Sequence, residues 1–443
     1  MSRGHVHASS VPVVDLAPSK DLPRAMDDSQ KVVINSNIDE WLKQEREHIK
    51  KRKAAKPEVK VMLLGQAESG KSTLQKQFQL HYASRTLDSE RPSWTPIVYF
   101  NIIKALRMII EELDYEFMGD APPPDSSPAS SPPSTAGSDW RSNLSELRTK
   151  VLPLVAIEDA LASELSGGIT LAGGKSGVYV RSGWQALVTP QRSWPLSDIR
   201  NTASANIPAV TNLAARTLVE TAYHVQDLWN HPAVKVLIRR RKLRLEESGT
   251  FFLDNIHRIA APDYLPSLDD VLHVRLQTLG VVEHQYDIRV NGVTYNWLMY
   301  DVGGARGQRH AWVPYFDDAT AIIFLAPISA FDQYLEEDPK TNRIDDSLQL
   351  FKAIVQNKLL KKASLVLMLN KTDLLREKLE AGAEVRKFIT SFGDRPNTYE
   401  EASEYFRAHF IQAHRREDIS QPRRPLYVHF TSMIHGSSSR MVL

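Results

Sequence analysis

Short apolar runs recur along the chain and alternate with longer amphipathic segments. Five of these runs have the length and continuity of buried strands. They are Val59–Leu64, Tyr295–Tyr300, Ala321–Leu325, Leu365–Leu369 and Leu426–Phe430. Segments with apolar residues at helical spacing include Ser72–His81, Ile344–Leu360 and Glu400–His414. This alternation of strands and helices predicts an α/β fold with a mostly parallel, doubly wound sheet.

The stretch between the first and second predicted strands has a different pattern. Thr95–Leu113 and Leu213–Leu237 repeat apolar residues at helical spacing, and strand signals are few. Two low-complexity segments interrupt it, the proline- and serine-rich Ala121–Ser138 and the glycine-rich Ser166–Gly177. Such segments bury too little apolar surface to offset the entropy lost on ordering them. We therefore expect a helical region that contains a disordered insertion over about residues 118–205.

The N-terminal part and the composition limit the classes of function. Residues 1–37 are expected to form a flexible tail and residues 38–58 a helix, whose Lys50–Lys53 run (KKRK) either touches anionic lipid or forms a solvated face. The net charge of +2 gives no strong attraction to nucleic acid. The lack of cysteine excludes disulfides and zinc–thiolate sites. With no signal peptide and no membrane-spanning apolar run, a cytoplasmic protein is expected.

The segment Gly65–Ser72 (GQAESGKS) fits the phosphate-loop pattern G-x-x-x-x-G-K-[ST]. It follows a predicted strand and opens a predicted helix, which is the placement that phosphate binding needs. Backbone N–H groups of such a loop point toward a polyphosphate. Lys71 would reach the terminal phosphates, and the Ser72 hydroxyl would bind Mg²⁺. The alternative interpretation is a glycine-rich turn between strand and helix that binds nothing.

The segment Asn370–Asp373 (NKTD) follows the predicted strand Leu365–Leu369. The carboxyl ends of parallel strands form the edge at which open sheets bind ligands. There, the Asp373 carboxylate can accept hydrogen bonds from N1–H and N2–H₂ of guanine, whereas adenine presents no such pair of donors. The tetrapeptide alone is a weak signal, because asparagine and aspartate are common in turns. Downstream of a phosphate loop, it favours guanine over adenine.

Several motifs, taken in order, resemble those of the alpha subunits of heterotrimeric G proteins. GQAESGKST resembles that family's GAGESGKST, and YDVGGARGQRHAW resembles its second switch, FDVGGQRxxRxKW. Between them, DVLHVRLQTLGVVE (Asp270–Glu283) resembles the first switch, DVLRxRxxTxGI. The resemblance implies a Ras-like P-loop GTPase domain formed by residues 59–84 and 270–443. It also implies an all-helical domain inserted at residues 85–269.

The same resemblance implies a function and partners. Members of that family bind GTP or GDP with Mg²⁺, hydrolyse GTP and act as signal switches. They are loaded with GTP by an activated G protein-coupled receptor, and they bind a beta–gamma dimer through the N-terminal helix. An effector is therefore a further expected partner, and nucleic acid is not expected. Attachment to the inner face of the plasma membrane would come from such partners.

Site residues are implied by matching positions in the family's motifs. The resemblance implies that Arg275 stabilises charge on the transferring phosphoryl group and that Glu68 pairs with it. It implies that Ser72, Thr278 and Asp301 hold Mg²⁺, the last through water. The residues expected to contact the nucleotide are Gly65, Glu68, Ser69, Gly70, Lys71, Ser72, Thr73, Ser248, Leu272, Arg275, Thr278, Gly304, Asn370, Lys371, Asp373 and Met433.

Two departures from the family concern hydrolysis. Ala305 stands at the catalytic position where the family has the glutamine that orients the attacking water, and a methyl group forms no hydrogen bond. Ala67 replaces the loop glycine beside the γ-phosphate, so its methyl is expected to crowd the attacking water. Together they predict nucleotide binding with slow hydrolysis. His310 is a candidate substitute for the glutamine, with an exposed surface residue as the alternative.

Other departures concern coupling and membrane attachment. The chain ends with IHGSSSRMVL, where the family continues into a long receptor-contacting helix, so we expect a truncated C-terminus and altered receptor coupling. Met433 replaces the alanine of the family's TCA loop, which touches guanine. Ser2 follows Met1, so N-myristoylation is not expected, and without cysteine there is no palmitoylation.

Three functions remain open from the sequence. The first is a GTP-hydrolysing signal transducer of the alpha-subunit type. The second is a hydrolysis-deficient protein that interacts with partners while GTP stays bound, or that sequesters a beta–gamma dimer. The third is an unrelated phosphate-loop kinase or ATPase, which the combination of NKTD with DVGG disfavours. Ala305 and Ala67 favour the second function, whereas Arg275 and Thr278 keep the first open.

Overall fold

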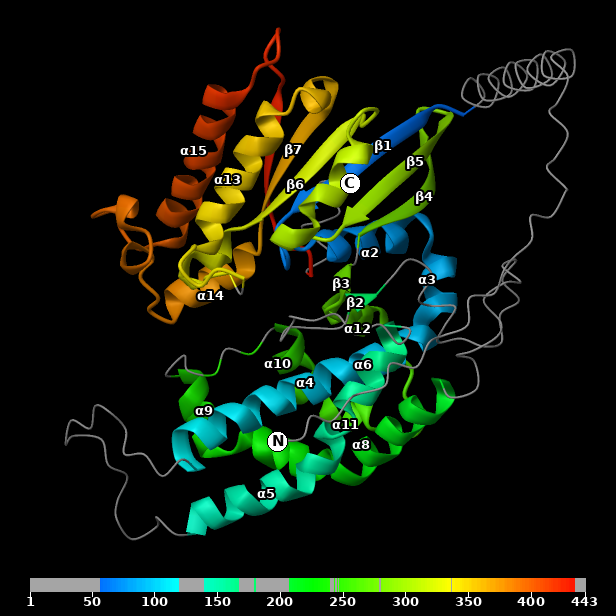
Figure 1. Cartoon of the computed structure of the whole chain (residues 1–443), viewed down its shortest axis with the longest axis vertical. Helices are drawn as coiled ribbons and strands as arrows, with labels where there is room; N and C mark the ends of the chain where they lie inside the picture. The colour runs from blue at the N-terminus through cyan, green and yellow to red at the C-terminus, as the bar shows by residue number, and fades with distance from the viewer. Residues whose placement is uncertain are drawn as a thin grey trace, which may run out of the picture. The chain divides into compact units, whose positions relative to one another are not determined.

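The computed structural model (Figure 1) describes residues 56–118, 139–166, 179–180, 207–239, 243, 245, 247–278, 280–335 and 337–434. The predicted tail over 1–37 lies outside these residues. Residues 38–55 of the helix predicted over 38–58 also lie outside them. Glu58 already belongs to the first strand. The proline- and serine-rich segment Ala121–Ser138 and the last residues of the chain also lie outside.

A six-stranded sheet forms the centre of the α/β part, in the order β4-β5-β1-β6-β7-β8. Its strands are β1 (Glu58–Gly65), β4 (Val281–Val290), β5 (Val293–Val302), β6 (Ala321–Pro327), β7 (Ser364–Asn370) and β8 (Leu426–Thr431). All neighbouring pairs are parallel except β4 and β5. All five predicted strands are present, and the expected mostly parallel sheet is confirmed.

The edge strand β4 was not predicted. It pairs antiparallel with β5 through a tight turn at Asn291 and Gly292, both of which have positive φ angles, 50° and 83°. Asn-Gly is the sequence that such a two-residue hairpin turn favours. Most side chains of β4 are exposed or only partly buried. The strand therefore lacks the continuous apolar run that identified the other five.

Helices cover both faces of the sheet and bury both (Figure 1). They are α2 (Lys71–Tyr82), α13 (Arg343–Gln356), α14 (Thr372–Glu380) and α15 (Tyr399–Glu417). Phe324 of β6 packs on one face against Phe351 and Phe410, whereas its neighbour Leu325 packs in the core on the other face. Because successive strand residues face opposite sides, burial on both sides requires the continuous apolar runs seen in the sequence.

The helical part has a hydrophobic core of its own, with buried residues from Leu87 to Val274. Its helices are α3 (Ser84–Glu90), α4 (Thr95–Leu113), α5 (Asp139–Val155), α6 (Glu158–Ser166), α8 (Ile207–Asn230), α9 (Pro232–Arg239), α10 (Glu247–Asp254), α11 (Ile256–Ile259) and α12 (Leu268–His273). The segment Leu213–Leu237, predicted to be helical, is helical except at His231, where it divides into α8 and α9. Pro232 starts the second helix, where its missing N–H costs nothing.

Short helical turns connect these elements. They are η1 (Arg91–Trp94), η2 (Asp114–Met118), η3 (Arg306–Tyr315), η4 (Ile328–Asp332), η5 (Leu359–Lys362), η6 (Val385–Lys387) and η7 (Thr390–Phe392). The helix predicted over Ile344–Leu360 accordingly ends at Gln356, before the separate turn η5. Within the described part of the chain, every helix is too short or too polar to cross a lipid bilayer.

The predicted disordered insertion over about 118–205 is wrong for residues 139–166. These residues form α5 and α6, and their apolar side chains, such as Leu144, Val151 and Leu161, are buried in the helical core. That burial offsets the entropy cost of ordering them. Residues 179–180 also form a short strand, β2 (Tyr179–Val180), which pairs in parallel with β3 (Gln277–Thr278).

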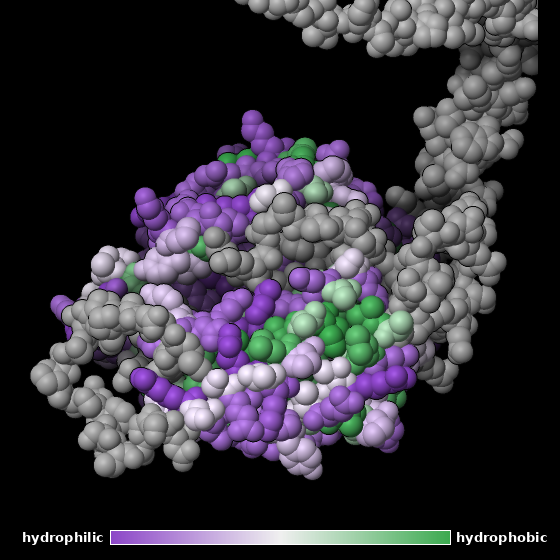
Figure 2. All heavy atoms as spheres, turned by 60° about the horizontal axis from the view of Figure 1, so that its bottom comes forward, coloured by the Kyte–Doolittle hydropathy of each residue, from purple (hydrophilic) through white to green (hydrophobic). Residues whose placement is uncertain are grey.

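Apolar side chains are also exposed on the helical part. Leu152 of α5 and Leu213 and Val219 of α8 are each more than a third exposed. Figure 2 shows apolar side chains grouped on one face of the molecule among polar and charged ones. The helical part therefore offers both apolar and charged surface to solvent.

One buried carboxylate holds the start of α12 within the helical part. Asp270 is fully buried and accepts hydrogen bonds from the Arg258 guanidinium at 2.6 and 2.8 Å and from the Tyr264 hydroxyl at 3.1 Å. Its carboxylate and the Ser267 hydroxyl also bond each other's backbone N–H groups, which caps the helix. Burial raises the pKa of Asp270, but the hydrogen bonds from Arg258 and Ser267 outweigh it and lower the pKa.

We expect Asp270→Ala to lower the free energy of unfolding by about 3 kcal/mol, because it leaves Arg258 and the cap without their shared partner. Urea unfolding followed by circular dichroism measures the change. Asp269→Ala is the matched control, since the Asp269 side chain is 63% exposed on the same helical turn. Equal losses of unfolding free energy in the two variants would contradict the role of Asp270 as the shared partner of Arg258 and the cap.

Candidate functional site

The phosphate-loop segment forms a tight connection between β1 and α2. Gly70 adopts a φ of 100°, and an added Cβ there would lie 2.3 Å from the Asn370 side-chain nitrogen. Glycine therefore lets Asn370 donate a 2.8 Å hydrogen bond to the Ser69 carbonyl. The buried Lys71 ammonium donates to the carbonyls of Gly65 at 3.1 Å and Gln66 at 2.6 Å. Burial lowers its pKa to about 8, against the opposing charge of Asp301.

The three residues expected to hold Mg²⁺ meet beside this loop. Ser72 of α2 donates to Oδ2 of Asp301 at 2.6 Å, and Thr278 of β3 donates to the same oxygen at 3.0 Å. The two hydroxyl oxygens are 3.2 Å apart. The other carboxylate oxygen, Oδ1 of Asp301, is buried and has no hydrogen-bond partner among the described residues. This cluster of hydroxyl and carboxylate oxygens fits Mg²⁺, which prefers oxygen ligands.

Glu68 links the loop to the predicted catalytic arginine. It has a left-handed φ of 61°, and its carboxylate pairs with both Arg275 and Arg343. Burial alone would raise the pKa of Glu68, but the charges of Arg343 and Arg275 outweigh it and lower the pKa strongly. Arg343 also donates to the Ala67 carbonyl at 2.6 Å. The structure thus places Arg275 at the loop, next to the predicted acid.

Asn101 of α4 positions the backbone of that arginine. Its side-chain oxygen accepts from the Arg275 N–H at 3.1 Å, and its side-chain nitrogen donates to the Arg275 carbonyl at 3.2 Å. The sequence analysis did not identify Asn101. An asparagine between apolar residues of a predicted helix was the available signal, because a buried amide needs partners.

The turn after β5 lies directly against the phosphate loop. An added Cβ at Gly304 would come within 2.5 Å of backbone atoms of Gln66 and Ala67. Ala305 follows in an extended conformation, partly buried, and precedes η3. The residue that follows Gly304 therefore carries no polar side-chain group. His310, the predicted substitute, is exposed, as the surface interpretation expects.

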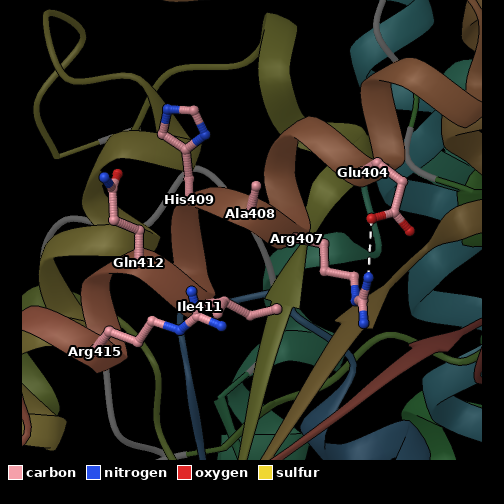
Figure 3. Close-up of a pocket in the computed structure, with 7 residues that line it drawn as sticks. All are labelled: Glu404, Arg407, Ala408, His409, Ile411, Gln412 and Arg415. Carbon is pink, nitrogen blue, oxygen red and sulfur yellow. Dashed lines mark hydrogen bonds and ion pairs between the residues drawn. The ribbon is translucent and has the colours of Figure 1, made fainter.

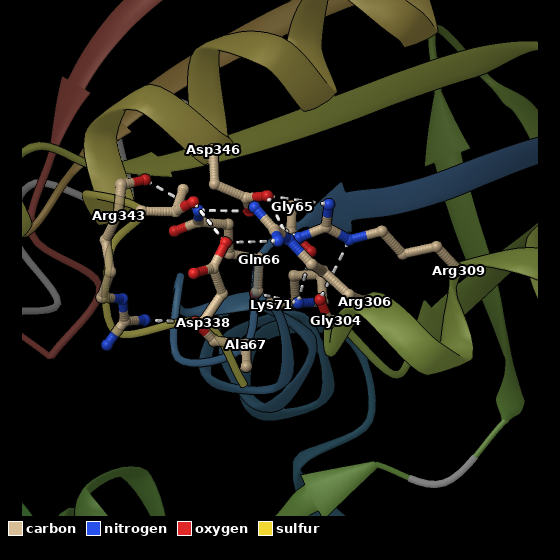
Figure 4. A network of polar contacts seen from close by, with 11 residues as sticks. Gly65, Gln66, Ala67, Lys71, Gly304, Arg306, Arg309, Asp338, Arg343 and Asp346 are labelled. Carbon is tan, nitrogen blue, oxygen red and sulfur yellow. Dashed lines mark hydrogen bonds and ion pairs between the residues drawn. The ribbon is translucent and has the colours of Figure 1, made fainter. Parts of the chain in front are cut away.

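Asp346 of α13 connects this turn to the loop, and the sequence analysis missed it (Figure 4). It is buried and accepts from Arg309 at 2.6 and 3.2 Å, from Arg306 at 3.0 Å and from the Gln66 side chain at 2.6 Å. Gln66 also donates to the Arg343 carbonyl at 2.7 Å. Burial raises the pKa of Asp346, but hydrogen bonds from Arg309 and Gln66 keep it lowered.

The residues expected to read the base meet at the carboxyl ends of β7 and β8. Asn370 accepts a 3.1 Å hydrogen bond from the Thr431 hydroxyl, and Lys371 follows with a left-handed φ of 65°. Ser432 donates to the Asp373 carboxylate. The buried Met433 accepts at its carbonyl from Gln77 of α2 at 2.9 Å. Asp373 is thus held beside the chain segment that carries Met433.

The remaining predicted residues lie on adjoining helices. Thr73 is on α2 and partly buried, and Ser248 lies buried in α10. Leu272 lies on α12, which contacts α10 through Phe251 and His273, whose rings stack with centroids 3.7 Å apart. The helices that carry Ser248 and Leu272 are therefore neighbours.

A hollow elsewhere on the surface does not include the predicted site. It is lined only by residues of α15, whose polar side chains fan outward in Figure 3. The lining residues are Glu404, Arg407, Ala408, His409, Ile411, Gln412 and Arg415. None of them is a predicted site residue, so the candidate site is the edge of the sheet at the phosphate loop.

The chain is similar to proteins of one known family over most of its length. A family model described as G-protein alpha subunit matches residues 33–443. The chain is 32% identical to the guanine nucleotide-binding protein alpha-4 subunit of Mycosarcoma maydis, with 87% of this chain and 80% of that protein covered. It is 30% identical to the guanine nucleotide-binding protein subunit alpha-13 of Mus musculus, with 92% and 87% covered.

We expect Asp346→Ala to release the turn after β5, because Arg306, Arg309 and Gln66 lose their common acceptor. Amide hydrogen exchange over residues 303–312 should become at least about tenfold faster. Asp345→Ala is the matched control, since Asp345 is the exposed neighbour on the same helix. Unchanged exchange in Asp346→Ala would show that this carboxylate does not hold the turn.

Proposed function

The chain belongs to the family of G-protein alpha subunits, and from this premise we propose that it binds GTP and GDP with Mg²⁺ and hydrolyses GTP slowly. The family membership makes it a guanine nucleotide-binding signal transducer in the general sense. The slow turnover, the roles of individual residues and the partners are the proposal. They are argued below from the contacts of the described residues.

One observation carries the proposed nucleotide binding. Side chains from three segments that are far apart in the sequence, Ser72, Thr278 and Asp301, converge on one point beside the buried Lys71. A buried ammonium next to hydroxyl and carboxylate oxygens suits a polyphosphate with its divalent cation. On entry of the nucleotide, Lys71 would exchange the carbonyls of Gly65 and Gln66 for phosphate oxygens.

The groups that would support hydrolysis are partly present. Ser72, Thr278 and Asp301 would hold Mg²⁺. When bound, the ion would neutralise charge on the β- and γ-phosphates. Arg275 would leave Glu68 to stabilise the charge that develops on the transferring group. The Gly304 N–H, on the turn that packs against the loop, would hold a γ-phosphate oxygen. These roles require only groups that the chain retains.

Position 305, where a water-orienting side chain is expected, carries none. Ala305 presents a methyl group at the turn, and the Ala67 methyl adds bulk to the loop. Phosphoryl transfer depends on positioning and electrostatic stabilisation rather than on covalent help, so an unaligned water slows it. Nucleotide binding uses Lys71, Asp373 and backbone N–H groups, none of which is replaced.

We further propose the partners that the family suggests, a beta–gamma dimer, a G protein-coupled receptor and an effector. The alternative is a protein that remains GTP-bound for long periods and acts by interaction, or that sequesters a beta–gamma dimer. The loss of a water-orienting side chain at Ala305 favours a long-lived GTP state. Any attachment to a membrane would come through these partners.

Calorimetry on the purified chain tests the binding. GDP and a non-hydrolysable GTP analogue should bind in the presence of Mg²⁺, whereas the matching ATP analogue should not. Asp373→Ala should weaken guanine nucleotide binding at least about tenfold, because it removes two charge-assisted hydrogen bonds to the base. Asp394→Ala, which changes an exposed aspartate, should bind as the wild type does. No heat of binding from the folded wild type would refute the proposal.

Single-turnover GTP hydrolysis tests the consequence of Ala305. We expect Ala305→Gln to raise the rate by about tenfold or more, because a carboxamide orients the water. Ala305→Leu is the matched control, since it adds similar bulk without hydrogen-bonding groups, and it should give no gain. If the wild type already turns over as fast as Ala305→Gln, the missing carboxamide does not limit hydrolysis.

A further inference from the structure

The helix α12 ends where side chains of two other helices take the place of its next backbone hydrogen bond. The Val274 N–H still donates to the Asp270 carbonyl at 2.9 Å, as in a regular α-helix. The next bond of the series would join the Arg275 N–H to the Val271 carbonyl. Instead, the Arg275 N–H donates to the Asn101 side chain at 3.1 Å, and Val274 has φ −57° and ψ 128°, outside the helical region. The chain therefore leaves the helix immediately before the predicted catalytic arginine.

Lys76 of α2 supplies the other half of that exchange. Its amine donates to the Val271 carbonyl at 2.8 Å and to the Val274 carbonyl at 2.9 Å. The last carbonyls of a helix have no partner within it, and a lysine side chain is a suitable donor to them. Here the lysine comes from a helix that lies 195 residues earlier in the chain. The donor and the acceptor that a further helical turn would have joined are thus satisfied separately, by Asn101 and by Lys76.

The Lys76 side chain is enclosed at this point. Lys76 is 2% exposed, and its amine nitrogen lies 4.7 Å from the centre of the Trp94 ring. Burial lowers the pKa of Lys76 to about 7, against the opposing charge of Asp301. The ring face and the two carbonyls stabilise the ammonium form, and the neutral amine still has two N–H groups for the two carbonyls. The side chain therefore holds the end of α12 in either charge state.

The position of the Arg275 backbone decides where its side chain lies. Asn101 holds both the N–H and the carbonyl of Arg275, and Lys76 holds the carbonyl of the residue before it. From there, the Arg275 guanidinium reaches the Glu68 carboxylate at the phosphate loop. Ser72 lies four residues before Lys76 on α2. One helix therefore joins the proposed Mg²⁺ site to the segment that carries the arginine.

We propose that Lys76 is a positioning residue for Arg275, because it fixes the end of α12 at the place from which the guanidinium can reach the transferring phosphoryl group. The inference rests on the proposed GTP hydrolysis. The guanidinium acts on charge that develops in the transition state, and a misplacement of about 1 Å can cost about a hundredfold in rate. Lys76 acts through Arg275 and needs no contact with the nucleotide. Its removal therefore affects the rate of hydrolysis and not the affinity for nucleotide.

Single-turnover hydrolysis on the full chain tests the proposal in a double-mutant cycle. Lys76→Met keeps an unbranched side chain of similar length but cannot donate a hydrogen bond, and it should lower the rate by about tenfold or more. In an Arg275→Ala background, the same substitution should change the rate less than about threefold, because no guanidinium remains to be positioned. Equal losses in both backgrounds would show that Lys76 supports only the fold, and they would overturn the proposal.

Amide hydrogen exchange gives a readout that needs no hydrolysis. In Lys76→Met, residues 271–276 should exchange at least about tenfold faster, whereas residues 303–312 should stay within about twofold of the wild type. Asn101→Leu removes the other half of the exchange from α4, so it should reproduce the faster exchange even where Lys76→Met does not fold. Lys361→Met changes an exposed lysine of η5 and should match the wild type. Wild-type exchange over residues 271–276 in Lys76→Met or in Asn101→Leu would contradict the proposal.

Affinity for the non-hydrolysable GTP analogue separates this inference from the proposed function. Lys76→Met should bind the analogue within about threefold of the wild type, because Lys76 acts on the transition state through Arg275. Absence of analogue binding by the folded wild type would refute the proposed function. Intact analogue binding together with wild-type hydrolysis by Lys76→Met would overturn the role of Lys76 alone.

Discussion

The carboxylate of Asp301 is the contact on which the arrangement of the site depends. Ser72 and Thr278 donate to the same oxygen of this group, so the start of α2, the short β3 and the end of β5 meet at one buried atom. The helical part lies between Ser72 and Thr278 in the sequence. Its return to the sheet edge is therefore fixed at the place where the phosphate loop begins.

Two further buried acids extend this arrangement outward. Glu68 pairs with Arg275 and Arg343, and Asp346 binds arginines of the turn after β5 together with Gln66 of the loop. Both acids have lowered pKa values despite their burial, so they remain charged at neutral pH. Because Arg343 lies three residues before Asp346 on α13, the two acid clusters share one helix. These contacts connect the phosphate loop both to Arg275 and to the turn after β5.

The sequence predicted those strands whose side chains are buried on both faces of the sheet. The strands β1, β5, β6, β7 and β8 carry continuous apolar runs because helices cover both faces of the sheet. The edge strand β4 has no such run, and only its Asn-Gly turn indicated it. The helices α5 and α6 were missed because the low-complexity segments around them dominated the composition. Only the tertiary structure shows that their scattered leucines are buried in the core of the helical part.

The sequence by itself determined the phosphate-loop pattern, the NKTD segment and the family resemblance, since each depends on residues that are neighbours along the chain. Local spacing fixes how a backbone turns and which side chains share a face. Only the tertiary structure decided the partners of Gln66, Asn101 and Asp346. Such contacts are short-ranged and directional, and they join segments that the sequence separates widely, so the pattern around each residue does not specify them.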